Sequence, residues 1–276
     1  MIRRLATIAL LVTALFAASC STFAGKDSKP ETMTPVLDGI LESGVLRVGL
    51  TGTQPPFNMK TRSGQIIGID ADLANALAET IGVRAEFVER PFGQLLDALE
   101  AGEVDIILSG MTMTPKRNTL VAFAGPYFIS GKAILTKSAT LARADEPDDI
   151  NKAGITLTAL AGSTSEEFVT QAVPSAKLIG TTDYDQAVKL VIDGGADAMV
   201  ADLPICVISV LRNPDAGLTT LASPFTFEPI GAAIPAHDPL FANLVQNYMN
   251  MLDGMGLMEA LQVKWFTNGA WLAELP

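Results

Sequence analysis

The stretch GEVDIILSGMTMTPKR, residues 102–117, decides the fold of this 276-residue chain. It begins at Gly102, a residue type that commonly ends a helix or forms a tight turn. Apart from Asp105, the run Val104–Leu108 is apolar, which is typical of a strand buried on both faces of a parallel sheet. The loop that starts at Gly110 would then leave the carboxyl end of that strand.

Strands and helices alternate on both sides of this stretch. Asp70–Ile81 carries apolar residues at helical spacing and ends at Gly82, and Arg84–Glu89 alternates as a strand does. The first expected set contains strands at 45–50, 84–89, 104–108 and 132–136, with helices at 70–81 and 92–99. The second contains strands at 155–160, 177–179, 198–201 and 229–234, with helices at 164–172, 183–192, 203–211, 238–252 and 256–265.

This alternation predicts an α/β fold with parallel sheets, and two such sets predict two lobes. In folds of this kind ligands bind outside the carboxyl ends of the strands. The crevice between the lobes is therefore the expected binding site. Residues 99–106 and 191–198 share a helix end, a glycine turn and an Asp that opens a strand. We interpret this as the same local helix-to-strand connection occurring twice.

The composition excludes several classes of function. The chain has 30 acidic and 19 basic residues and a formal net charge of −11, so no nucleic-acid partner is expected. One histidine, His237, and two distant cysteines give no metal-ligand spacing, and no metal or other cofactor is expected. Neither Ser nor Cys has a histidine in the pattern that nucleophilic catalysis requires.

Residues 1–19 have the pattern of an export signal. Arg3 and Arg4 precede an apolar run, Leu5–Phe16, which is too short to cross a hydrocarbon core of roughly 30 Å. The following AASC ends at Cys20 and resembles a lipobox, which predicts cleavage before this cysteine and a lipid on its thiol. The alternative is an ordinary signal peptide that is cleaved nearby.

The lipidated N-terminus and a tether are expected to occupy residues 20–43, where Lys, Ser, Thr, Pro and Glu show little apolar periodicity. With Cys20 lipidated, Cys206 has no partner and is expected to be a small buried apolar residue. The expected location is the periplasm or cell envelope, with the protein anchored to a membrane through Cys20.

Eight motifs occur in an order that resembles the family 3 extracellular solute-binding proteins, the polar-amino-acid receptors of ABC importers. Together they span nearly all of residues 44–266. They are VLRVG at 45–49, PPF at 55–57, GIDADL at 68–73, GEVDII at 102–107, SGMTMTPKR at 109–117, GPYF at 125–128, GST at 162–164 and ADLP at 201–204.

This resemblance implies a type II periplasmic-binding-protein fold, in which two doubly wound lobes are joined by a two-segment hinge. Lobe 1 would comprise residues 44–134 plus 231–276, and lobe 2 residues 135–230. The chain would cross between the lobes near 131–137 and again near 227–232.

The resemblance also implies which residues hold an amino acid. Arg117 stands at the family's carboxylate-binding position, and its planar guanidinium suits a two-point contact; alone it would be taken for a surface arginine. Asp202 is the expected ammonium partner, although an Asp two residues before Pro204 also commonly caps a helix. A zwitterion between these two side chains would bridge the lobes and stabilise the closed state.

Four residues in two loops are expected to complete the ligand-binding site. Gly110 allows a ligand to approach the backbone, and the Thr112 hydroxyl can accept from an ammonium or donate to a carboxylate. Ser163 and Thr164 open a helix whose N-terminal amides would favour an anion, and a plain helix cap is the alternative.

The side-chain pocket departs from the family pattern. Gln54 replaces an aromatic residue, and Thr51 stands where members that bind lysine or arginine often have an acid. Phe92 supplies the other expected aromatic wall, whereas Phe57 more readily packs in the core beneath the loop. These changes favour a small, neutral or polar amino acid.

The expected function is therefore a substrate-binding lipoprotein that delivers an amino acid to the membrane subunits of an ABC permease, as a monomer and without catalysis. One alternative is a cyclohexadienyl (prephenate or arogenate) dehydratase on the same fold. Glu166 and Glu167 are the nearest acids for such chemistry, but acids in a first helical turn commonly just complement the helix dipole. A second alternative is a ligand sensor that reports to a membrane receptor.

Overall fold

The computed structural model describes residues 34–276, so the predicted signal peptide and Cys20 lie outside the described residues. The predicted tether does not include its last nine residues, because Pro35–Ser43 form helix α2. Leu37 and Ile40 are buried, and the Asp238 carboxylate accepts hydrogen bonds from the backbone N–H groups of Val36 and Leu37. This partner lies about two hundred residues away along the chain, which explains why local composition gave no sign of the helix.

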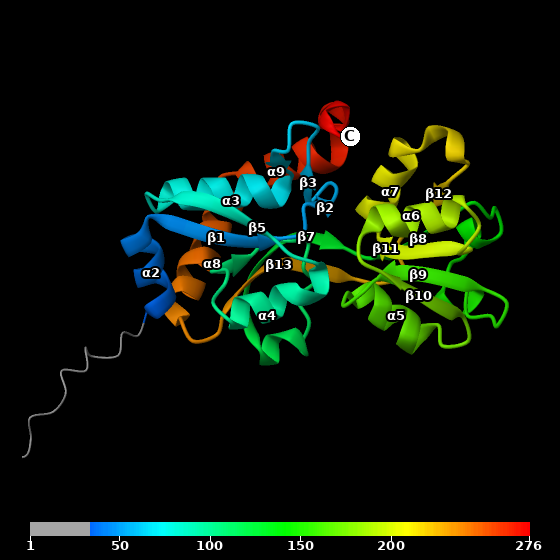
Figure 1. Ribbon diagram of the computed structural model, residues 1–276, viewed down its shortest axis with the longest axis horizontal. Helices are drawn as coiled ribbons and strands as arrows, with labels where there is room; N and C mark the ends of the chain where they lie inside the picture. The colour runs from blue at the N-terminus through cyan, green and yellow to red at the C-terminus, as the bar shows by residue number, and fades with distance from the viewer. Residues whose placement is uncertain (1–33) are drawn as a thin grey trace, which may run out of the picture. The chain divides into compact units, whose positions relative to one another are not determined.

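The first of two five-stranded sheets contains β5, β1, β6, β13 and β7 in that order (Figure 1). Its central strands, β1 (Val45–Leu50) and β6 (Ile106–Ile107), are parallel to each other and buried. On the outer side of β1 lies β5 (Arg84–Glu89), also parallel. Helices α3 (Ile69–Thr80) and α4 (Leu95–Glu100, preceded by the 3-10 turn Phe92–Gln94) pack against this sheet.

The second sheet has the order β10, β9, β11, β8 and β12. Its parallel part confirms the predicted alternation of strands and helices. The strands are β8 (Lys132–Thr136), β9 (Thr156–Leu160), β10 (Lys177–Thr181), β11 (Ala198–Asp202) and β12 (Thr219–Thr220). The helices are α5 (Thr164–Ala172), α6 (Tyr184–Ile192) and α7 (Leu203–Arg212).

The chain returns to the first sheet for its last part. Here β13 (Glu228–Pro235) pairs antiparallel with β6 and with β7 (Val121–Ser130), a ten-residue strand that the sequence analysis did not predict. Helix α8 (Pro239–Gly254) follows, and the predicted helix at 256–265 is divided into α9 (Leu257–Gln262) and a π-helical turn. A small sheet of β2 (Thr53–Gln54), β3 (Asn58–Lys60) and β4 (Ile66–Ile67) lies beside the crevice.

Two segments connect the lobes, as a two-segment hinge requires. The first passes from β7 to β8 through Gly131, and the second leads from β12 to β13. They lie against each other, because the Lys132 amide donates to Thr226 Oγ1 at 2.9 Å and the Phe225 amide donates to the Lys132 carbonyl at 2.7 Å. A Cβ at position 131 would lie 2.1 Å from the Thr226 carbonyl oxygen, so only glycine allows this approach.

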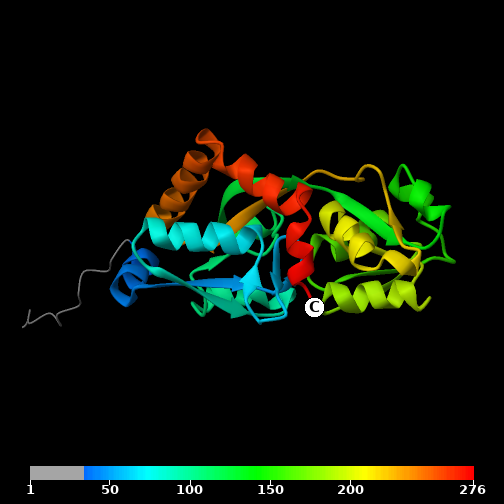
Figure 2. The same cartoon turned by 90° about the horizontal axis from the view of Figure 1, so that it is seen from above.

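The lobe that contains β1 lies beside the lobe that contains β9 and β11 (Figures 1 and 2). The loops that follow β6 and β9 meet between them, since the Thr112 and Thr164 hydroxyl groups lie 3.2 Å apart. The C-terminal turn, Ala270–Glu274, packs within lobe 1, where the Arg62 amide donates to the Glu274 carbonyl at 3.0 Å. A cavity near the end of this turn is also lined by α6 and α7 of lobe 2. The strand predicted at 104–108 is shorter than expected, because β6 contains only Ile106 and Ile107. It still leads into the loop that is proposed to bind a ligand.

Candidate ligand-binding site

Arg117 opens a short 3-10 turn (Arg117–Thr119) after the Gly110 loop, and only 9% of its surface is exposed. Its guanidinium donates to the Thr112 carbonyl at 2.9 Å in its own lobe and to the Gly162 carbonyl at 3.3 Å in lobe 2. The Phe92 ring centroid lies 5.5 Å from Cζ, a cation–π distance. Burial lowers the pKa of Arg117, and nearby carboxylates, with Glu167 foremost, oppose this effect.

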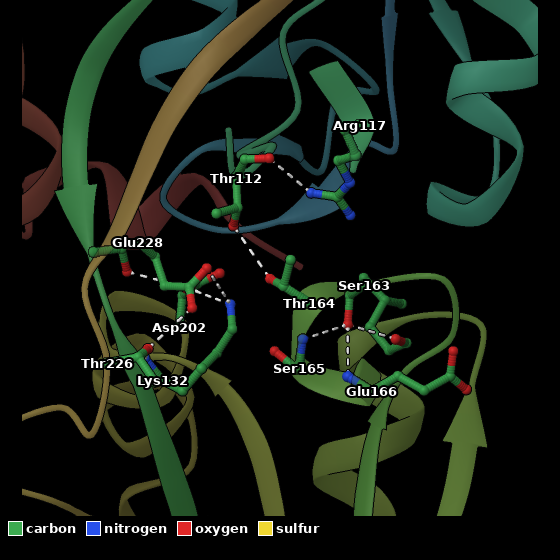
Figure 3. Close-up of polar contacts among 12 residues, drawn as sticks. Thr112, Arg117, Lys132, Ser163, Thr164, Ser165, Glu166, Asp202, Thr226 and Glu228 are labelled. Atoms are coloured by element: carbon green, nitrogen blue, oxygen red, sulfur yellow. Dashed lines mark hydrogen bonds and ion pairs between the residues drawn. The ribbon is translucent and has the colours of Figure 1, made fainter. Parts of the chain in front are cut away.

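The two lobes touch at several points in this region, so the structure has a closed crevice. The hydroxyl groups of Thr112 and Thr164 lie 3.2 Å apart across it (Figure 3). The Lys116 ammonium pairs with the Glu167 carboxylate at its edge. A Cβ on Gly162 would lie 2.7 Å from Cα of Gly93, which shows that backbone meets backbone between the lobes.

Ser163 caps helix α5, which is the alternative that the sequence analysis left open. Its Oγ accepts from the Ser165 and Glu166 amides and donates to the Leu160 carbonyl (Figure 3). The Gly162 amide donates to Glu166 Oε2 at 2.8 Å. These bonds occupy the Gly162, Ser165 and Glu166 amides, which we expected to bind a ligand anion. Thr164 instead faces the opposite lobe through its hydroxyl group.

Asp202 ends β11 and is buried, but it makes no side-chain hydrogen bond to the first turn of α7. Its Oδ1 instead pairs with Lys132 Nζ at 3.0 Å and accepts from Ser130 Oγ at 3.2 Å. Glu228 Oε2 lies 3.6 Å from the same ammonium. The expected ammonium partner therefore already has a cation beside it (Figure 3).

Lys132 and Glu228 are site residues that were not predicted from the sequence. Both belong to the connecting segments, where β8 begins and where β13 begins. A lysine directly before the apolar run 133–135 was the available signal, since a lysine that faces a core needs a carboxylate partner.

Gln54 is buried, and its side chain lies in a cluster of polar side chains rather than in an aromatic wall. Its Oε1 accepts from Ser109 Oγ at 2.6 Å and lies 3.1 Å from Thr51 Oγ1. From lobe 2, the buried Tyr184 on α6 hydrogen-bonds to Gln54. Burial raises the pKa of Tyr184 well above its ordinary value, and nearby Asp202 adds to this effect. Tyr184 was likewise not predicted as a site residue, only as part of a helix.

Phe57 packs in the core of lobe 1, as the sequence analysis favoured. Its ring contacts Phe128 and Phe266 in edge-on geometry, with centroids 5.8 Å and 5.4 Å away. Gly110 lies above it with φ of +56°, and a Cβ there would meet the Phe57 ring at 3.1 Å. A glycine is thus needed at 110 for backbone conformation and for packing beneath the loop.

Residues 34–276 contain neither a membrane-spanning helix nor a metal-binding cluster. No helix in this range is both long and apolar enough to cross a membrane. Within the same residues, His, Cys, Asp and Glu side chains form no group of three that could hold a metal ion.

Cys206 is buried, and burial raises the pKa of its thiol to about 12.

The fold and the closed crevice define a class, the two-lobed solute-binding proteins. Residues 46–268 match the model of the bacterial extracellular solute-binding proteins, family 3, and the chain belongs to that family.

Known relatives include binding proteins and an enzyme. Cyclohexadienyl dehydratase from Pseudomonas aeruginosa is 29% identical over 229 residues, which cover 83% of this chain and 85% of that protein. The glutamine-binding protein of a Bacillus subtilis ABC transporter is 27% identical over 95% of each chain.

Among solved structures, an ancestral amino acid-binding protein described as a precursor of cyclohexadienyl dehydratase is 36% identical. It aligns with a TM-score of 0.76 over 83% of this chain and 99% of its own. An ancestral arginine-binding protein bound to arginine is 31% identical, with a TM-score of 0.76 over 81% of this chain and 98% of its own.

Proposed function

We propose that this protein captures a small neutral or polar amino acid between its lobes and delivers it to the membrane subunits of an ABC permease. One observation carries the proposal: Arg117 and Asp202, both buried, belong to opposite lobes of one closed crevice. An amino acid presents a carboxylate and an ammonium, and burying both groups requires a partner for each.

The carboxylate would bind Arg117. Two of the five guanidinium N–H groups are held by carbonyl oxygens of Thr112 and Gly162 within the described residues, which fixes the plane of the fork. Three donors remain for a ligand. Because one of the two carbonyls belongs to lobe 2, Arg117 also helps to hold the crevice shut.

The ammonium would bind the Asp202 carboxylate, with Glu228 close by. Lys132 partly neutralises both acids, so together these three groups carry one net negative charge. A ligand ammonium balances that charge, whereas a ligand with a second cationic group would leave an unpaired charge in a buried site. The Thr51, Gln54 and Tyr184 polar groups suit a neutral side chain with hydrogen-bonding atoms.

The proposed setting is the cell envelope, with the mature chain a monomer held to a membrane by a lipid on Cys20. Closure of the lobes around the ligand would create the surface that the permease recognises. The same clamp could instead report ligand occupancy to a membrane receptor, and a neighbouring permease and ATPase gene pair would favour transport.

A dehydratase is the second candidate, because an enzyme of that activity stands among the relatives. The two acids nominated for it have other partners in this structure. Glu166 accepts from the Gly162 amide, and Glu167 pairs with Lys116 at the exposed edge of the crevice. These partners occupy both acids, and this supports binding without turnover.

The test is thermal unfolding of the mature chain with each of the twenty amino acids and with prephenate. A ligand at about 100 times its Kd adds about 2.7 kcal/mol to the unfolding free energy. We expect one or a few neutral amino acids to raise the melting temperature. Arg117→Ala should abolish the rise, and Arg117→Lys should restore little of it, because an ammonium lacks the planar fork.

Arg84→Ala is the matched control, since Arg84 pairs with Glu86 on the exposed edge strand β5. It should leave the ligand-induced shift unchanged. If prephenate alone raises the melting temperature and is converted, the enzyme assignment replaces the binding protein. If Arg117→Ala retains the full shift, the ligand is held elsewhere.

A further inference from the structure

A fully buried carboxylate, Asp70, lies directly behind the Gly110 loop. It belongs to the first turn of α3. Its Oδ2 accepts hydrogen bonds from the Gly110 amide at 3.1 Å and from Asn58 Nδ2 at 2.8 Å. Its Oδ1 accepts from the Tyr127 hydroxyl at 2.6 Å. Three donors from three separate segments therefore converge on one side chain.

The network continues from Asn58 to the wall of the crevice. Because its Nδ2 donates to Asp70, the Asn58 side chain must present Oδ1 in the opposite direction. That oxygen accepts from the Gly52 amide at 2.8 Å and lies 3.0 Å from Thr51 Oγ1. The Asp70 carboxylate in the core thus helps to orient Thr51 through Asn58, together with Gln54, whose Oε1 lies 3.1 Å from Thr51 Oγ1.

We propose that Asp70 is a positioning residue of the ligand-binding site. It touches no ligand; it holds the Gly110 loop directly and holds Thr51 through Asn58. This role rests on the proposed function, because Gly110 and Thr51 matter here as residues of the amino-acid site. Without the Asp70 oxygens, the buried Gly110 amide loses its acceptor and the loop must shift to find another. Asn58 Nδ2 loses its shortest hydrogen bond and keeps only the longer ones to Gln54 Oε1 at 3.5 Å and Ser109 Oγ at 3.4 Å.

The hydrogen-bond pattern shows which replacement should preserve this role. Gly110 N–H and Asn58 Nδ2 can only donate, whereas the Tyr127 hydroxyl can also accept. An asparagine at position 70 can therefore keep its oxygen towards Gly110 and Asn58 and donate its amide to Tyr127. Asp70→Asn conserves the two bonds that orient the site, and Asp70→Ala removes them.

The experiment compares ligand affinity, melting temperature and hydrogen exchange in the mature chain. Using the amino acid that stabilises the wild type, we expect Asp70→Ala to raise Kd at least tenfold and Asp70→Asn to change it less than threefold. Leu73→Ala is the matched control, because Leu73 is a buried residue of the same helix without a part in the network. It should lower the melting temperature and leave Kd within twofold.

Exchange of the Gly110 amide provides a readout that needs no ligand. Its protection should be lost in Asp70→Ala and kept in Asp70→Asn and Leu73→Ala. The proposal is overturned if Asp70→Ala binds within threefold of the wild type, or if Leu73→Ala loses affinity in proportion to its stability. If the wild type binds no amino acid, the proposed function fails, and the Gly110 exchange still decides whether Asp70 holds the loop.

Discussion

At the scale of single residues, the site depends on charges that burial makes costly. Lys132 is 1% exposed and lies between the carboxylates of Asp202 and Glu228. An ammonium at such a position is stable only with carboxylate partners, and the partners equally need the ammonium. The three side chains therefore act as one unit, in which a change of one alters the charge that a ligand meets.

We expect Lys132→Met to destabilise the protein by about 3–5 kcal/mol, because it leaves two buried carboxylates without their cation. The same change should improve binding of lysine and arginine relative to glutamine, since a cationic ligand can replace the lost ammonium. Urea unfolding and calorimetric Kd values measure these effects. Lys189→Met is the control: Lys189 pairs with Asp193 on the exposed face of α6, and its loss should cost less than about 1 kcal/mol. Unchanged stability and unchanged ligand ranking would contradict the prediction.

Asp70 should make stability depend on pH. Burial raises its pKa from 3.8 to about 7, although its hydrogen bonds to Tyr127, Asn58 and Gly110 act in the opposite direction. A carboxyl whose pKa is higher in the folded state stabilises fully below its unfolded pKa. That contribution is lost as the pH rises through the folded value. Its loss between about pH 4 and 7 amounts to the order of 4 kcal/mol.

Asp70→Asn should remove this part of the pH dependence. The measurement is urea unfolding of both proteins at a series of pH values from 4 to 8, and the quantity of interest is the difference between the two curves. That difference isolates Asp70 from the other carboxylates. A constant difference over this range would show that the Asp70 pKa is not raised.

At the scale of helices and strands, the sequence predicts what local pattern determines. Helix α5 has the predicted bounds, Thr164–Ala172, because a serine cap and a helical pattern define them locally. Strand β7 was missed, since Gly125-Pro126 interrupts its pattern and its pairing with β13 depends on residues about a hundred positions away. Helix α2 was missed for the same reason, because its N-terminal amides bond to Asp238.

Several residues of the candidate site could be predicted from the sequence, but their partners could not. The sequence singled out Arg117, Asp202, Thr112 and Thr164, and the fold brings them to one crevice. It could not reveal their partners. Lys132 reaches Asp202 from a segment 70 residues away, and Tyr184 reaches Gln54 from the other lobe. These contacts depend on tertiary packing, which no local pattern encodes.

A substitution at Gly162 tests whether closure of the lobes requires the close backbone contact between Gly162 and Gly93. Gly162→Ala should raise Kd at least tenfold, because its Cβ would lie 2.7 Å from Gly93 Cα and prevent full closure. Gly194→Ala is a closely matched control. Gly194 has a φ of +78°, against +75° for Gly162, but nothing lies within 4 Å of its Cβ position. Both changes carry similar backbone strain, so equal Kd values in the two variants would show that the Gly93 contact does not limit closure.

At the scale of the whole molecule, the contacts between the lobes within residues 34–276 include backbone groups, hydroxyl groups and the exposed Lys116–Glu167 ion pair. These polar contacts involve groups that water can also satisfy, so each adds little net free energy to closure. Such an interface is weak without a ligand between Arg117 and Asp202. Closure should therefore depend on the ligand's differential contacts with the two lobes.

The Lys116–Glu167 pair offers a way to measure closure without altering the binding site. Its Nζ and Oε1 atoms lie 2.5 Å apart across the lobes, and both side chains are exposed. A water-soluble carbodiimide activates the carboxylate, the amine displaces the urea by-product, and an amide joins the lobes. We expect this cross-link to form several times faster with saturating ligand than without it. Lys189 of α6 and Asp193, the residue that follows this helix, lie 2.6 Å apart and form an internal reference whose rate should not respond to ligand. Equal interlobe rates with and without ligand would mean that the lobes close regardless of occupancy, and closure would then not be the signal that a permease reads.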